Sequence, residues 1–147
     1  MSENHFDVVV IGGGPGGYAS ALYGASAGLN IAIIEYNKIG GTCLNVGCIP
    51  AKELLETAAV FRAVNHASDF GVLAEAKGVD WDTVLARKQK IIDQLVGGVG
   101  SLLKMRKVTV YDGTGTLGSD HRTVSISGGE SGDVQITGDA VILAAGS

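Results

Sequence analysis

The first part of the chain alternates between apolar runs and one segment of small residues. The run Phe6–Ile11 is apolar and mostly β-branched, which predicts a strand buried on both faces of a parallel sheet. Tyr18–Gly28 is rich in Ala, Ser and Gly and predicts a helix that can lie close to that sheet. Ile31–Glu35 predicts the next strand. Together the segments predict a βαβ unit.

Two longer helices are predicted next. Pro50–Val64 has helical periodicity, and Asn65–Gly78 has the composition of a loop. A second helix is predicted to start near Asp80, a suitable capping residue, because apolar positions then recur at spacings of three and four. Gly97 and Gly98 interrupt this pattern.

The last part of the chain changes to short alternating stretches separated by Gly, Ser and Asp clusters. The stretches are Val108–Tyr111, Gly115–Leu117, Val124–Ile126 and Val134–Ile136. They predict an antiparallel meander. A further apolar strand is predicted at Ala140–Ala144, followed by the start of a turn.

The composition narrows the range of partners. The chain has 147 residues and a mass of 15.0 kDa, which suits one domain over residues 1–147. Its net charge of -4 and lack of a basic run give no footprint for nucleic acid or an anionic membrane. No apolar stretch approaches the roughly 20 residues that span a bilayer. The few residues before the first strand leave no room for a targeting segment, so a cytoplasmic location is expected.

The turn after the first strand has the pattern of a dinucleotide site. Gly12, Gly14 and Gly17 satisfy Gly-x-Gly-x-x-Gly between a strand and a helix. Gly12 would permit the tight turn, Gly14 close approach to a pyrophosphate, and Gly17 close packing of helix on strand. Glu35, at the end of the second strand, can accept hydrogen bonds from ribose hydroxyls. The alternative is a glycine-rich surface turn, which the register of strand, helix and Glu35 disfavours.

Two cysteines, Cys43 and Cys48, follow this unit. Positions five apart in an ideal helix have Cα atoms roughly 8 to 9 Å from each other. That separation exceeds the roughly 7 Å limit for a disulfide. A bridge therefore needs an irregular segment, which Gly47 and Pro50 could provide. The pair is either a disulfide that exchanges electrons with a flavin or two free, packed thiols.

Other interpretations of this region are weaker or remain open. A zinc site is disfavoured because the three histidines are scattered without ligand spacing, so no metal site is predicted. Lys52 is either a cation near the thiolate or the flavin ring, or a solvated lysine in a first helical turn.

The segment Gly40–Lys52 closely resembles the active-site signature of the pyridine nucleotide-disulfide oxidoreductases. The first glycine turn, the segment Asp112–Gly115 and the segment 142–147 resemble that family as well. The resemblance implies an α/β fold: a Rossmann-like FAD-binding domain with a parallel sheet, flanking helices and an antiparallel β-meander. It covers the whole chain but implies only the amino-terminal FAD domain, without the family's NAD, central and dimerisation domains.

Within the family the cysteine segment is most similar to dihydrolipoamide dehydrogenases, although Ala51 departs from their commoner Ser. In such enzymes dihydrolipoamide reduces the disulfide, the dithiol reduces FAD, and the electrons pass to NAD⁺. The implied partners are dihydrolipoamide or a lipoylated acyltransferase of 2-oxo acid dehydrogenase complexes, and a second copy in a homodimer. Alternatives are a glutathione- or mercuric-reductase-like enzyme and a non-catalytic FAD-binding module.

The resemblance also assigns roles to residues. Cys43 would be the interchange thiol that meets the substrate, and Cys48 the thiol beside the flavin. The residues implied to contact FAD are Gly12, Gly14, Pro15, Gly16, Gly17, Glu35, Gly41, Thr42, Lys52, Gly115, Ala145, Gly146 and Ser147. The family's catalytic His and Glu lie in the carboxyl-terminal domain of the partner subunit. The chain by itself is therefore expected not to turn over lipoamide with NAD⁺.

Overall fold

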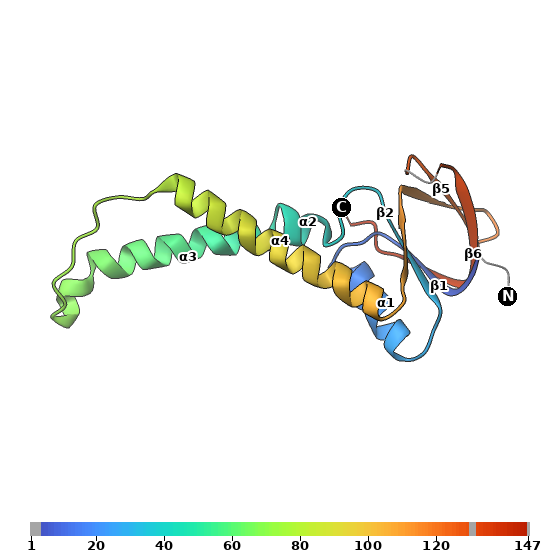
Figure 1. Cartoon of the computed structure of the whole chain (residues 1–147), viewed down its shortest axis with the longest axis horizontal. Helices are drawn as coiled ribbons and strands as arrows, with labels where there is room; N and C mark the ends of the chain where they lie inside the picture. Colours follow the sequence, from blue (N-terminus) through green and yellow to red (C-terminus); the bar gives the residue numbers. More distant parts are fainter. Residues whose placement is uncertain (1–3, 130–131, 147) are drawn as a thin grey trace.

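A computed structural model describes residues 4–129 and 132–146, which form one six-stranded sheet with helices against it (Figure 1). The strands are β1 His5–Ile11, β2 Ile31–Glu35, β3 Thr109–Asp112, β4 Thr114–Leu117, β5 Thr123–Ser127 and β6 Val134–Leu143. Their order across the sheet is β3-β2-β1-β6-β5-β4. Strands β3, β2, β1 and β6 are parallel, whereas β5 and β4 continue the sheet antiparallel. The predicted α/β class with a parallel sheet and a meander is confirmed.

Four α-helices and one 3₁₀ helix occur among the described residues. They are α1 Pro15–Ser26, α2 Gly41–Asn45, α3 Cys48–Asn65, η1 Ala67–Phe70 and α4 Trp81–Met105. The three helices expected from the sequence are confirmed, and α4 runs without a break through Gly97 and Gly98. Helix α2 was not predicted, because five residues are too few to show a helical period. The expected loop after α3 contains η1.

Helices α3 and α4 form a hairpin that projects away from the sheet (Figure 1). Asp80 caps α4 as predicted, since its side chain accepts hydrogen bonds from the backbone N–H groups of Asp82 and Thr83. Neither long helix buries much of its apolar surface, and Leu55 and Phe61 are both exposed. Within the ranges that the structure describes, no helix is long and apolar enough to cross a membrane.

Side chains of the parallel strands alternate between two apolar layers, as the pleat of a strand requires. One layer packs under α1 and α4 and contains Val10, Ile31, Ile33, Ala21, Leu103 and Val108. The other packs against β5 and β6 and contains Phe6, Val9, Ile11, Ala32, Ile34, Val124, Ile126 and Ile136. All of β2 is buried, which explains why its sequence is continuously apolar up to Glu35.

Of the four stretches predicted to form the antiparallel meander, the first does not belong to it. The first stretch forms β3, which pairs in parallel with β2 in the register Ala32↔Thr109, so its assignment to the meander was wrong. The connection through the helical hairpin returns the chain to the same end of the sheet, as a parallel pair requires. The alternating pattern of the four residues of β3 suits a parallel or an antiparallel pair equally, so the sequence did not specify its direction.

The prediction of separate strands at Val134–Ile136 and Ala140–Ala144 was also wrong, because one strand, β6 Val134–Leu143, covers the first stretch and all of the second except Ala144. Gly138 lies between the two predicted stretches. In the structure it allows close approach to β1, since a Cβ there would lie 2.9 Å from a methyl carbon of Val9. Thr137 pairs with β5 on one side and β1 on the other, so β6 joins the meander to the parallel strands.

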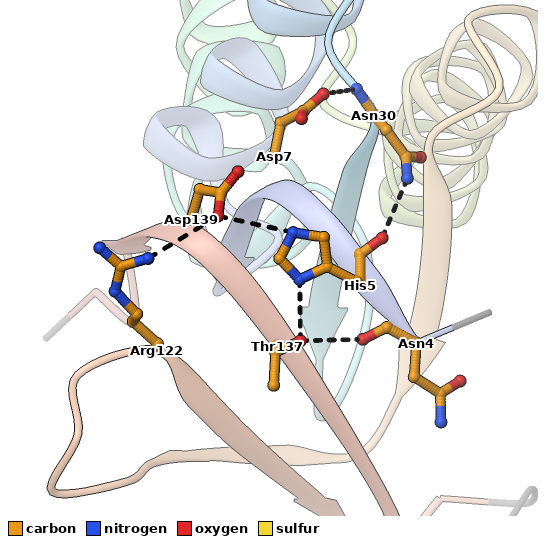
Figure 2. Close-up of polar contacts among 7 residues, drawn as sticks. All are labelled: Asn4, His5, Asp7, Asn30, Arg122, Thr137 and Asp139. Atoms are coloured by element: carbon orange, nitrogen blue, oxygen red, sulfur yellow. Dashed lines mark hydrogen bonds and ion pairs between the residues drawn. The ribbon is translucent and has the colours of Figure 1, made fainter. Parts of the chain in front are cut away.

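A polar cluster joins the strands at the amino end of β1 (Figure 2). The Nδ1 atom of His5 lies 3.0 Å from the hydroxyl oxygen of Thr137, and its Nε2 lies 3.5 Å from a carboxylate oxygen of Asp139. Arg122, beside β5, contacts the same carboxylate at 3.7 Å. The cluster links β1, β6 and the turn before β5.

Candidate functional site

The glycine turn between β1 and α1 is closely packed against its neighbours. Gly12 has φ +109°, and a Cβ there would overlap the carbonyl oxygen of Ala144. A Cβ on Gly17 would overlap the carbonyl oxygen of Gly12. Gly14 is the N-cap of α1 and has no side chain with which to cap the helix. The helix therefore presents backbone N–H groups and the positive end of its dipole, which favour an anion such as a pyrophosphate.

Glu35 fixes this turn from the end of β2. Its Oε2 accepts a hydrogen bond of 2.7 Å from the backbone N–H of Gly13, and its Oε1 accepts one of 2.9 Å from that of Asn37. The residue is only 8% exposed. Glu35 thus stabilises the shape of the turn through its own two hydrogen bonds, without a bound ligand. The predicted contact with ribose would be a second role.

Replacing Glu35 by Gln is expected to destabilise the fold. Only one oxygen remains in the amide, so one of the two backbone N–H groups faces an NH₂ group instead of an acceptor. The cost of a buried, unsatisfied donor is about 1–3 kcal/mol of unfolding free energy, measured by urea denaturation. Glu56→Gln, on the exposed surface of α3, is the control. Equal losses in both variants would contradict the role given to Glu35.

The segment after β2 lies directly against the glycine turn. The backbone N–H of Gly40 donates a hydrogen bond of 2.8 Å to the carbonyl of Gly13. A Cβ on Gly41 would lie 2.7 Å from the Cα of Gly14, so the two backbones approach as only glycines allow. Helix α2 starts at this contact, and Cys43 is its third residue. Cys43 therefore lies close to the glycine turn.

The two cysteines lie on either side of a helix break, the irregular segment that a disulfide between them would need. Cys43 belongs to α2, the chain turns at Val46 and Gly47, and Cys48 is the first residue of α3. Pro50 lies in the first turn of α3, where a missing N–H costs nothing. Both cysteines are free thiols in the structure, Cys43 half-buried and Cys48 exposed.

The two thiols and a lysine interact electrostatically. Hydrogen bonding with the Cys48 side chain raises the pKa of Cys43 above its ordinary value, and burial raises it further. The positive charge of Lys52 acts in the opposite direction and lowers the pKa of Cys43. A reactive thiolate thus depends on the state of its neighbour and on one nearby cation.

The turn, the acid and the thiols surround one cavity of about 500 Å³ at the carboxyl ends of the parallel strands. This volume is within the ordinary range for small-molecule sites. Ten predicted site residues line it: Gly14, Pro15, Gly16, Glu35, Gly41, Thr42, Cys43, Cys48, Ala145 and Gly146. In the sheet, β1 lies between β2 and β6, and the strand order changes direction there. The cavity lies at the carboxyl ends of these strands, the switch point at which α/β sheets bind ligands.

Comparison with known proteins agrees with this geometry. A family model described as pyridine nucleotide-disulphide oxidoreductase matches residues 6–147. The chain belongs to this family. Its sheet and flanking helices are accordingly those of a Rossmann-like FAD-binding domain.

Curated relatives in the family are named dihydrolipoyl dehydrogenase. One from Bacillus subtilis is 43% identical over 142 residues, covering 95% of this chain and 31% of the relative. One from Vibrio cholerae is 44% identical and covers 95% of this chain and 29% of the relative. One from Acholeplasma laidlawii is 41% identical and covers 83% of this chain and 37% of the relative. The chain thus spans about a third of the length of these relatives.

Four predicted site residues lie outside the cavity lining. Gly12 and Gly17 lie beneath the turn, where they allow its shape. Lys52 is exposed on α3. Gly115 lies on β4, and a Cβ there would lie 3.2 Å from a side-chain carbon of Ile34. Ser147 lies outside the described residues.

Several residues of the lining were not predicted. They are Tyr36, Asn37, Lys38, Asn45, Val46 and Ala144. The first three directly follow Glu35 in the sequence. They could have been predicted, because residues just after a strand that ends beside the glycine turn are expected to border the same site. Asn45 lies between the two cysteines, and no pattern in the sequence indicates its role.

No histidine lines the cavity, and His5 lies in the polar cluster at the other end of β1. Within residues 4–129 and 132–146, no group of three or more His, Cys, Asp or Glu could hold a metal ion.

Replacing Lys52 by Met is expected to slow the alkylation of Cys43 by iodoacetamide at a fixed pH near 8. Lys52 stabilises the thiolate, so its loss raises the pKa of Cys43, lowers the thiolate fraction and moves the pH–rate profile to higher pH. Mass spectrometry assigns the modified cysteine. Lys77→Met, in the exposed segment before α4, should leave the profile unchanged. A profile that stays in place, or moves to lower pH, in the Lys52 variant would refute the interaction.

Proposed function

We propose that this chain is the FAD-binding part of a dihydrolipoyl dehydrogenase, comprising residues 1–147, in which Cys43 and Cys48 form the redox pair. The observation that carries the proposal is the shared cavity, because it is lined by the turn suited to a pyrophosphate and by both thiols. A flavin dinucleotide is an extended molecule, so its pyrophosphate and its flavin ring would lie at different ends of the cavity, at the glycine turn and at the thiols. The names of the relatives support the substrate class.

The residues of the cavity fit FAD in three places. The uncapped start of α1, around Gly14, suits the pyrophosphate. Glu35 borders the cavity, and each of its oxygens retains a free lone pair for a ribose hydroxyl. The thiol end suits the flavin ring, with Cys48 beside it and Cys43 toward the substrate. Gly115, Lys52 and Ser147 are further proposed contacts.

FAD, when bound, supplies the two-electron acceptor that amino-acid side chains lack. The chain's own part is thiol chemistry. In the oxidised pair Cys43 and Cys48 form a disulfide. A substrate thiolate attacks the Cys43 sulfur and the Cys48 thiolate leaves. The second substrate thiol then displaces Cys43, so the substrate becomes the disulfide and the pair gains two electrons and two protons. Closing the bond from Cys48 to Cys43 again releases these two electrons and two protons, which bound FAD would accept. The positive charge of Lys52 lowers the pKa of Cys43 and so supports its thiolate.

The wider activity belongs to the longer protein. There we propose dihydrolipoamide, free or on a lipoylated acyltransferase of a 2-oxo acid dehydrogenase complex, as the electron donor. NAD⁺ is the proposed acceptor, and a homodimer the proposed assembly. A cytoplasmic location is proposed as well, because a reducing compartment suits thiols that cycle rather than a permanent disulfide.

The test is a titration of the purified chain with FAD, followed by anaerobic addition of dihydrolipoamide. Retention of yellow flavin after gel filtration and a long-wavelength charge-transfer band after reduction are the expected results. Flavin that is retained without the band would instead indicate an FAD-binding module without thiol redox coupling. Failure to retain FAD would overturn the proposal for this chain.

A further inference from the structure

Asn45 connects the glycine corner after β2 to the helix that carries Cys43. Its side-chain NH₂ donates hydrogen bonds to two carbonyl oxygens, that of Ile39 at 3.2 Å and that of Gly41 at 2.9 Å. The first carbonyl precedes α2 and the second belongs to its first residue. Asn45 is also part of the cavity lining. One side chain thus ties both ends of α2 together beside the cavity.

The two bonds require an amide at this position. Both acceptors are backbone carbonyls, so the group between them must donate twice. Asn does so through its NH₂ group, whereas Asp has no donor and Leu, of similar shape, has none either. The orientation of the amide is fixed by the same fact, because turning it over would set three oxygens against one another.

Helix α2 needs such a link. It has five residues, far fewer than a helix requires for stability on its own. Its N-cap Gly40 and its first residue Gly41 have φ of +99° and +56° and contribute flexibility rather than restraint. Side-chain bonds across this corner therefore restrict where Cys43 lies relative to Cys48.

We propose that Asn45 is a positioning residue that sets the approach of the Cys43 thiol to the Cys48 thiol. It does not contact the reacting sulfur atoms and acts through the shape of α2. The inference rests on the proposed function, because it assumes that the two thiols form a disulfide. Without the two bonds, the folded state spends less time in the arrangement from which the disulfide closes.

The test is the equilibrium of the chain with a glutathione redox buffer, without FAD. Two thiols are converted to a disulfide while one glutathione disulfide is reduced to two glutathione molecules, so the equilibrium constant is the effective concentration of Cys43 for Cys48. Asn45→Leu should lower this constant about tenfold, or about 30 mV for a two-electron couple. Asn45→Ala, whose smaller side chain cannot clash, should lower the constant by a similar factor. It serves as the test if the Leu variant does not fold. Circular dichroism checks folding.

The matched control is Asn65→Leu at the exposed end of α3. The proposal requires an unchanged constant in this variant and lowered constants in both Asn45 variants. Constants equal to that of the original chain in the Asn45 variants would overturn the inference while leaving the redox pair intact. An equal decrease in the Asn65 variant would overturn it too. If the original chain forms no bond between Cys43 and Cys48 at any buffer ratio, the proposed function itself fails.

Discussion

Replacing Gly17 by alanine is expected to destroy the glycine turn and with it the binding of FAD. A Cβ at this position would overlap the carbonyl oxygen of Gly12, and the atom it meets is backbone that cannot turn away. Because Gly17 is buried in the first turn of α1, relief requires α1 to move off the sheet. We expect a loss of about 3 kcal/mol or more in the free energy of unfolding, measured by urea denaturation, and no retained flavin.

Gly16→Ala is the matched control for stability, one position away in the same helix. A Cβ at Gly16 would lie 3.9 Å from the Cβ of Ala144, an ordinary contact. Alanine is also the better helix former, by up to about 1 kcal/mol. Unfolding midpoints that fall equally in the two variants would show that the overlap is not the cause.

Serine at either cysteine is expected to abolish lipoamide turnover in the longer protein that contains this chain. The hydroxyl preserves the shape of the thiol but cannot form the disulfide. The loss should reach on the order of 10⁶-fold, the scale seen when one group of a covalent catalyst is removed. Steady-state kinetics with dihydrolipoamide and NAD⁺ measures it.

The two serine variants should differ in their spectra. With FAD bound, Cys43→Ser should keep the charge-transfer band, because Cys48, the thiolate proposed to lie beside the flavin, remains, and Cys48→Ser should lose it. Flavin content serves as the control, since neither substitution removes a backbone contact of the glycine turn. The opposite pattern would exchange the roles proposed for the two cysteines.

The site could be predicted from the sequence where local rules apply. The spacing of Gly12, Gly14 and Gly17 fixes a turn whose shape depends on the absence of side chains. The end of the apolar strand at Glu35 puts an acid near that turn. A disulfide between Cys43 and Cys48 would need a break in the helix between them, and the structure has one at Val46 and Gly47. Each of these inferences depends on a few neighbouring residues.

Other features depend on contacts between distant segments, and for these the sequence was insufficient. β3 has an alternating pattern that suits either direction, and its parallel pairing with β2 follows from the path of the helical hairpin. Gly138 lies inside β6, and the close approach of β1, which no local pattern indicates, explains a glycine at that position. The role of Asn45 depends on two carbonyl groups that only the folded corner brings together.

The sequence by itself determined the βαβ unit, the glycine turn and the family, because hydrophobic period and glycine spacing are local constraints on backbone shape. Tertiary structure decided that the turn, Glu35 and both thiols share one cavity, because the carboxyl ends of β1, β2 and β6 meet only when the parallel strands pair. It also decided that β6 is one strand, since pairing partners on both sides, rather than its own composition, keep it continuous.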